Sequence, residues 1–238
     1  MHARPSSAAA SILLAGALGN LALADVGPGP RPPRPASPSV VAPSVRMHFP
    51  HYAAQKGFVF NPPAGFAEVP VTRNPDMLCE HAVVDAAKRV EVRYALRPFA
   101  RDDLQRYQDY VNHRLPQGTV ITDPNQRGMA EFMAVAMNVS GGGFKAPQRI
   151  EPAMAKELFD ADEGRVATLA NPTSQFAKGW QKIMVIQIFK RNVGHAYLFL
   201  LFNDDQDLPA AGLAYPAFRA LRFGVAPPPE QPILIPPT

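Results

Sequence analysis

The chain has 238 residues, of which 47% are hydrophobic and 18% are charged, and its net charge at neutral pH is +4. Its single cysteine, Cys79, excludes a disulfide within the chain, so an apolar core has to stabilise the fold. The small positive surplus is not gathered into a run of Lys or Arg, which argues against a nucleic-acid-binding protein.

Residues 1–24 have the composition of a secretory signal peptide. Arg4 lies near the start, residues 8–24 carry no charge, and Ala22-Leu23-Ala24 places small residues at the cleavage positions. We expect cleavage after Ala24 and therefore a secreted or periplasmic bacterial protein. A retained membrane anchor and a buried N-terminal helix are the alternatives, although the apolar stretch is shorter than the roughly 20 residues of a spanning helix.

A lipid anchor is not expected. Leu14-Ala15-Gly16-Ala17 resembles the bacterial lipoprotein box, but Ala17 stands where the lipidated cysteine is required. The next most apolar stretch, residues 183–202, contains Lys190, Arg191 and Gly194, so it predicts two strands and a turn instead of a membrane span.

Two proline-rich segments flank the middle of the chain, at residues 25–46 and 224–238. Proline fixes the backbone and removes a hydrogen-bond donor, and such segments bury too little to offset the entropy of ordering. We predict a disordered linker and a tail. The residues between them, 47–223, are enough for one domain with a substantial core.

In the first half of that domain, residues 57–66 predict a short strand and a proline turn, and residues 77–84 predict a second strand. Residues 89–97 alternate: Val90, Val92, Tyr94 and Leu96 fall on one side, and Arg89, Glu91, Arg93 and Arg97 on the other. This period is typical of a half-buried antiparallel strand. Helical spacing follows at residues 101–115, with an apolar stripe of Leu104, Tyr107, Val111 and Leu115. Val120 and Ile121 suggest a short strand, and residues 126–139 a helix.

In the second half, residues 151–159 predict a helix and residues 166–169 a strand. Residues 181–191 and 195–203 are apolar at almost every position and predict two strands joined by a turn at residues 192–194. A terminal helix is expected over residues 209–223. The fold class is α+β, with a mostly antiparallel central sheet and helices packed on it.

The opening "GFVF" with its following prolines, the alternating strand that leads into a helix, and the closing hairpin followed by "FRALRF" resemble the PsbP-like α/β/α sandwich family over residues 50–223. The resemblance implies an extracytoplasmic accessory or binding module without a catalytic signature. It transfers no functional residues to this chain.

Two short patterns bear on catalysis or calcium binding, and neither meets the requirements of its chemistry. The acidic run at residues 160–164 has Gly164 at its fifth position and Asn171 at its twelfth, where an EF-hand needs glycine at the sixth and glutamate at the twelfth. We interpret it as a turn between a helix and a strand. Ser140 lacks the first glycine of a nucleophile elbow, because Asn138 stands there, so residues 140–143 predict a flexible turn.

Two residue pairs each offer two metal ligands. His48 and His51 are three residues apart, and Cys79 and His81 are expected on one face of a strand. Zinc takes three or four protein ligands, so no metal site and no cofactor are predicted. The apolar neighbours of Cys79 favour a buried thiol.

The polar side of strand 89–97 supplies the one candidate partner-contact face, formed by Arg89, Arg93 and Arg97. It would suit an acidic protein surface or an anionic lipid, although neutralisation by Glu91 is the simpler interpretation. Trp180 is expected at the edge of the core.

We predict a non-catalytic binding or accessory module whose partner is another envelope protein or a cell-envelope component. The alternatives are an extracytoplasmic hydrolase whose catalytic groups come from scattered residues, and a structural cell-envelope protein.

Overall fold

The computed structural model describes residues 48–71, 73–74, 77–140, 143–170, 174–177, 179–204 and 214–224. The predicted signal peptide and linker, and all but Gly224 of the predicted tail, lie outside these residues. Within them, no helix is both long and apolar enough to span a membrane.

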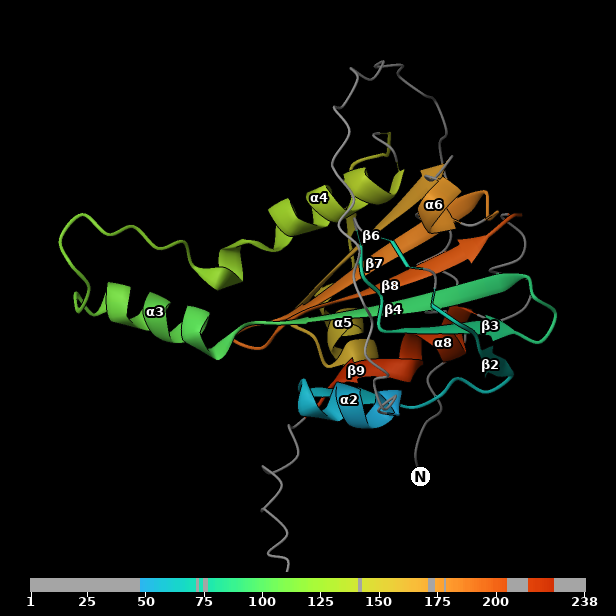
Figure 1. The fold of residues 1–238 in the computed structure, drawn as a ribbon, viewed down its shortest axis with the longest axis horizontal. Coiled ribbons are helices and arrows are strands. Elements are labelled where there is room, and N and C mark those ends of the chain that lie inside the picture. Colours follow the sequence, from blue (N-terminus) through green and yellow to red (C-terminus); the bar gives the residue numbers. More distant parts are fainter. Residues whose placement is uncertain are drawn as a thin grey trace, which may run out of the picture.

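A seven-stranded sheet forms the centre of the described part, in the order β2-β3-β4-β8-β7-β6-β5, and every neighbouring pair is antiparallel (Figure 1). This confirms the predicted fold class. The strands are β2 (Phe66–Glu68), β3 (His81–Asp85), β4 (Val90–Pro98), β5 (Gln148–Arg149), β6 (Glu163–Ala170), β7 (Lys182–Lys190) and β8 (Gly194–Phe202). A second, two-stranded sheet pairs β1 (Phe58–Phe60) with β9 (Leu221–Phe223).

The hairpin of β7 and β8 is the most buried part of the sheet. All nine residues of β8 are buried, as the unbroken apolar run predicts for a strand covered on both faces. The turn needs two left-handed residues, Asn192 with φ 60° and Gly194 with φ 142°. A Cβ atom on Gly194 would lie 2.5 Å from the carbonyl oxygen of Arg97, so no other residue fits this position without moving the neighbouring strand.

One face of the sheet is covered by α2 (Phe49–Gln55), α5 (Pro152–Phe159), α8 (Ala214–Ala220) and the small sheet (Figure 1). Phe58, Phe159, Phe218 and Phe223 form much of this core layer, against Tyr94 and Leu198 of the main sheet. The predicted terminal helix is therefore too long at its end. Leu221–Phe223 pairs with β1 as a strand, because this places Leu221 and Phe223 in the core while Arg222 stays exposed.

The other face is covered by α4 (Gly128–Ser140) and the short α6 (Ser174–Ala177). Phe132, Ala136 and Val139 of α4 and Phe176 of α6 pack on Tyr197, Phe199 and Leu201. The prediction that β4 has one solvent-exposed face is wrong. Five consecutive residues of β4, Val92 to Leu96, are buried because α6 covers the side that carries Arg93.

Residues 99–127, which we call the arm, leave the sheet after β4 and return at the start of α4 (Figure 1). The arm contains α3 (Arg101–Val111) and the 3-10 turn η1 (Pro124–Gln126). The predicted helix exists but ends at Val111, so Leu115 lies outside it, and residues 120 and 121 form no strand. No residue of α3 is buried, and its apolar stripe does not enter the core.

Candidate functional site

A groove of about 550 Å³ lies where the arm meets the turn between β7 and β8. One wall is the apolar stripe of α3, and the other is polar and comes from η1 and the turn. The lining residues are Leu104, Tyr107, Gln108, Val111 and Asn112 on the α3 side, and Asp123, Asn125, Arg191 and Asn192 opposite.

The polar wall is held in place by a reciprocal amide pair. Asn125 donates from Nδ2 to Oδ1 of Asn192 at 3.0 Å, and its own Oδ1 accepts from the backbone N–H of Asn192 at 2.8 Å. The Asp123 carboxylate caps η1 by accepting the N–H of Asn125 at 2.9 Å. These bonds fix η1 to the hairpin turn, so the polar wall is preformed.

The apolar wall is open to solvent. Leu104 and Tyr107 are half-buried, and Val111 is 54% exposed. Tyr107 and Tyr110 lie with their ring centroids 6.4 Å apart and present aromatic surface on the same helix. An amphipathic helix that keeps its apolar stripe outside the core is typical of a surface that a partner covers.

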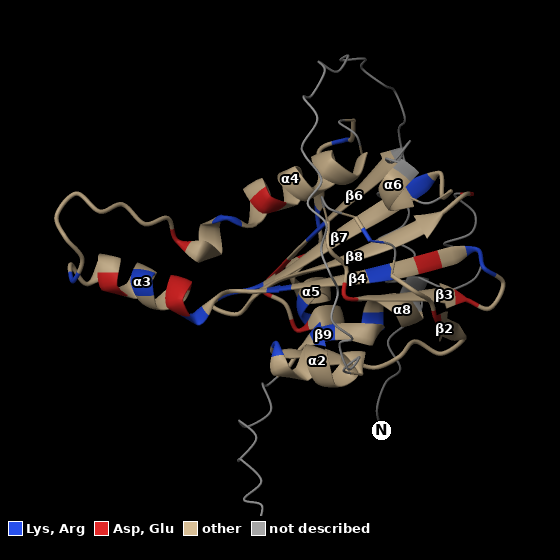
Figure 2. Cartoon of the chain, in the orientation of Figure 1, with Lys and Arg blue, Asp and Glu red and all other residues tan. Residues whose placement is uncertain are grey.

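Charges of both signs alternate on α3, whereas the central strands carry few (Figure 2). Asp102 and Asp103 occupy its first turn, and Arg114, just after it, lies 3.6 Å from Asp109. A mixed surface of this kind has no strong net attraction for nucleic acid or for an anionic membrane. It suits a protein or another polar polymer.

A second polar cluster lies under α4, at the end of the sheet near the arm. Arg165, Gln187 and Tyr197 are neighbours across β6, β7 and β8. The Gln187 side-chain nitrogen donates to the carbonyl of Gly128 at 3.0 Å and lies 2.9 Å from the Tyr197 hydroxyl. The Gln187 side-chain oxygen accepts a hydrogen bond from Arg165 at 3.2 Å. This network fastens the start of α4 to the sheet.

His195 lies beside this network and is only 1% exposed. Its ring packs between Phe189 and Phe99, with centroid separations of 5.0 and 5.2 Å, and neither ring nitrogen has a hydrogen-bond partner in the described part. Burial, and then the positive charge of Arg165, lower the pKa of His195 to about 4. The Glu131 carboxylate lies 3.4 Å from Nε2, and burial raises its pKa. The imidazole is therefore neutral at pH 7.

This cluster does not have the arrangement of a catalytic site. A Cβ atom on Gly128 would lie 3.1 Å from Cε1 of His195, so the start of α4 packs directly on the ring, and both ring nitrogens are buried. Burial raises the pKa of the Cys79 thiol to about 12, so it stays protonated and is a poor nucleophile. Ser140 is the last residue of α4, and its hydroxyl faces the Met137 carbonyl at 3.5 Å.

The Ser140 turn is only partly as predicted. Ser140 belongs to the helix, residues 141 and 142 lie outside the described part, and Gly143 is described beyond them.

The two residue pairs considered as metal ligands lie in different surroundings. Cys79 is half-buried, less than the predicted buried thiol, and packs against the core layer that contains residues of α4 and α6. His81 stacks on Phe49 at 4.3 Å in the opposite layer, so the expectation that the two residues share one face is wrong. His51 hydrogen-bonds to Gln55 at 3.1 Å. Among the described residues, no group of three or more His, Cys, Asp or Glu side chains is placed to hold a metal ion.

The acidic run is a turn between α5 and β6, as predicted. Asp160 adopts the left-handed conformation that ends α5 and pairs with Lys156 at 2.5 Å and with Lys190 at 2.6 Å. These hydrogen bonds lower the pKa of Asp160. The Asp162 carboxylate accepts the N–H of Arg191 at 2.8 Å. The carboxylates of Asp160 and Asp162 thus serve as partners of cationic and backbone donors.

The three arginines of the candidate partner-contact face differ in burial, because Arg93 is buried whereas Arg89 and Arg97 are partly exposed. Arg93 is completely buried: Nε lies 2.6 Å from Glu91, Nη1 donates to the Phe176 carbonyl, and the guanidinium lies 4.9 Å from the Phe176 ring. It does not lie on an exposed face, and Glu91 neutralises it. Trp180 donates to the same carboxylate at 3.1 Å and packs at the core edge, as predicted.

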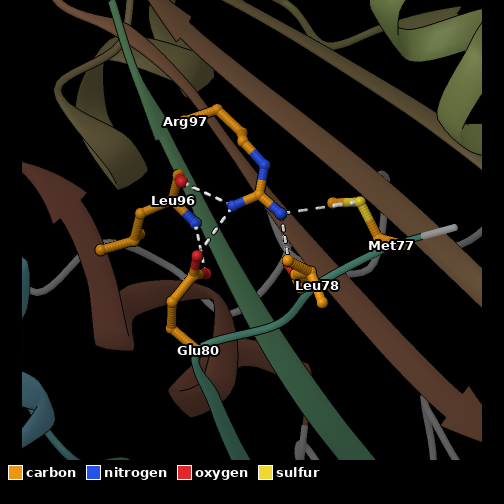
Figure 3. Close-up of polar contacts among 5 residues, drawn as sticks. All are labelled: Met77, Leu78, Glu80, Leu96 and Arg97. Atoms are coloured by element: carbon orange, nitrogen blue, oxygen red, sulfur yellow. Dashed lines mark hydrogen bonds and ion pairs between the residues drawn. The ribbon is translucent and has the colours of Figure 1, made fainter. Parts of the chain in front are cut away.

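Arg97 is one-third exposed and is engaged within the protein (Figure 3). Its guanidinium donates to Glu80 at 2.8 Å and to the carbonyls of Leu96 and Leu78, and so ties residues 77–80 to β4. Arg89 is 44% exposed and lies 3.7 Å from Asp85. Contact of Arg89 and Arg97 with a partner stays a prediction.

Comparison with protein-family models and with curated proteins gives no match. Among solved structures, the solution structure of cyanobacterial PsbP (CyanoP) from Synechocystis sp. PCC 6803 is similar to this chain, with a TM-score of 0.37 and 13% sequence identity over 71% of this chain and 87% of that chain. At these values the likeness carries no argument about function, and membership of the PsbP-like family stays a prediction.

Proposed function

We propose that this protein is a non-catalytic binding module of the cell envelope, and that the arm is the element that binds its partner. The observation that carries the proposal is α3: it is an amphipathic helix with no buried residue, held away from the sheet beside a preformed groove. A helix of this length is marginal in water unless a tertiary contact or a partner covers its apolar stripe.

The partner is a protein or another polar component of the envelope. The apolar stripe of α3 supplies contact area, and the alternating charges on its other faces supply orientation without a strong field of either sign. The proposed location, secreted or periplasmic after cleavage behind Ala24, is supported by the composition of residues 1–24.

The hydrolase alternative has less support. A hydrolase of this kind would be supported by a serine or cysteine beside an accessible histidine. Cys79 is protonated at neutral pH, and the His195 nitrogens are sealed beneath α4.

The proposed role of the arm is tested by measuring how much partner the protein captures from envelope material of the cells that produce it. The tagged full chain is compared with Leu104→Ser/Val111→Ser and with Met137→Ser, whose side chain is 53% exposed on α4, as the control. Because surface substitutions change stability by only about 0.5 kcal/mol, all three proteins should unfold at similar temperatures.

We expect the arm variant to capture at least about tenfold less partner by quantitative mass spectrometry, a loss of about 1.4 kcal/mol, while the control captures the wild-type amount. Equal capture by the arm variant contradicts the proposal. Binding to purified wall material alone would support the structural envelope protein instead.

A further inference from the structure

We infer that the groove of the arm is a binding site for the proline-rich segment 225–238 of the same chain. The inference does not rest on the proposed function, because it concerns a contact within one molecule; since the contact uses the same stripe of α3, a partner that covers the stripe has to displace the segment. It follows from where the described chain ends, from the side chains that the groove presents, and from the composition of segment 225–238.

The described chain ends close to the groove. The N–H of Gly224 donates to the carbonyl of Gly57 at 3.1 Å, and a Cβ atom on Gly57 would lie 3.6 Å from Val193. Val193 follows Arg191 and Asn192, which line the groove. Segment 225–238 therefore begins beside Gly224, whose hydrogen-bond partner Gly57 lies near Val193, the residue that follows Arg191 and Asn192 of the polar wall. Its 14 residues would span about 43 Å in the polyproline conformation.

The groove has the two features by which proline-rich segments are recognised, aromatic surface and hydrogen-bond donors. Tyr107 and its apolar neighbours on α3 supply the surface. Within the described part of the chain, no hydrogen bond or ion pair involves the side-chain nitrogens of Gln108, Asn112 or Arg191. These donors suit the carbonyls of a proline-rich strand, which has few N–H groups of its own.

Segment 225–238 complements the groove in charge and in apolar character. Its single charged side chain is that of Glu230, whose carboxylate matches the guanidinium of Arg191. Farther along, Ile233-Leu234-Ile235 is a run of large apolar side chains between prolines. Exposing these apolar side chains to water is unfavourable in free energy. Packing them on the stripe of Leu104, Tyr107 and Val111 would remove them from water.

Hydrogen exchange of the full chain tests this contact. The wild type is compared with Ile233→Ser/Leu234→Ser/Ile235→Ser, and with Val40→Ser/Val41→Ser as a control in the other proline-rich segment. For a short tether the effective concentration is millimolar, so a contact of millimolar affinity slows exchange of the covered amides by about twofold. We expect faster exchange in α3 and residues 190–193 for the tail variant only, and the same effect from Arg191→Ala.

Equal exchange of α3 in the wild type and the tail variant would overturn the inference. The measurement is repeated after tenfold dilution to distinguish one molecule from two. Protection that survives dilution supports a contact within one chain, and protection that is lost on dilution assigns the groove to a second copy and overturns it. Thermal unfolding of each protein checks that the sheet is intact.

Discussion

Replacing His195 with leucine tests whether this buried imidazole makes the fold sensitive to acid. The folded-state pKa of about 4 lies below the value of about 6.5 in an unfolded chain. Between pH 6.5 and pH 4 the imidazole is protonated in the unfolded chain but not in the folded protein, so the free energy of unfolding falls as the pH falls from 6.5 towards 4. The loss amounts to about 1 kcal/mol at pH 6, 2 kcal/mol at pH 5 and 3 kcal/mol at pH 4.

His195→Leu removes this titration and keeps a side chain that packs between Phe99 and Phe189. At pH 7.5 the variant should lie within about 1.5 kcal/mol of the wild type. Burial raises the pKa of Glu131, which acts in the opposite direction because acid relieves the cost of a buried carboxylate. Because its carboxylate lies 3.4 Å from Nε2 of His195, the comparison is repeated in a Glu131→Gln background, which removes this second titration from both proteins.

The assay is urea unfolding followed by circular dichroism at pH 7.5, 6, 5 and 4. We expect the free energy of unfolding of the variant, relative to wild type, to rise by about 3 kcal/mol between pH 7.5 and pH 4. A constant difference across this range would refute the assignment of a neutral, buried His195.

Three other predictions use the same unfolding assay or a thiol probe. Gly194→Ala should lower the free energy of unfolding by about 3 kcal/mol or more, because the added Cβ meets the backbone of the next strand. In the control Gly143→Ala the added Cβ meets nothing within 4 Å, so the free energy of unfolding should change by no more than about 0.5 kcal/mol. Similar losses in the two variants would contradict the contact. Arg93→Ala should cost about 3–5 kcal/mol, because it leaves the Glu91 carboxylate without its buried partner, and a cost below 1 kcal/mol would show that the pair is solvated. Cys79 should react with a disulfide reagent at least about a hundredfold more slowly in the folded protein than in urea, and equal rates would show that the thiol is accessible.

The sequence predicts the sheet best where one signal is strong over many residues. The apolar runs of β7 and β8 and the turn between them are confirmed almost to the residue. β9 was missed because three residues after a helix give no period of their own, and its pairing with β1 depends on a strand more than 160 residues earlier in the chain. α6 was missed for the same reason of length.

The misreading of β4 has a different cause. Alternation of Val and Tyr with Arg and Glu indicates a solvent-exposed polar side, but four residues of α6 are enough to cover it and to bury Arg93 against Phe176. The signal that could have shown this is Ala95, a small apolar residue on the supposedly polar side. The groove was not predictable, because it needs the hairpin turn and the arm to meet in space.

Both ends of the arm meet at the same place. At one end, the N–H of Phe99 donates to the carbonyl of Val193 at 2.9 Å. At the other end, Gly128 packs on His195, which follows Val193 by two residues. The entropy of closing a loop grows only slowly with its length, so an excursion anchored in this way can lengthen, shorten or change its sequence at little expense to the sheet. If the arm binds the partner as proposed, it is the part of the chain in which partner choice can change while the sheet stays constant, and it is a natural position for grafting a foreign recognition helix.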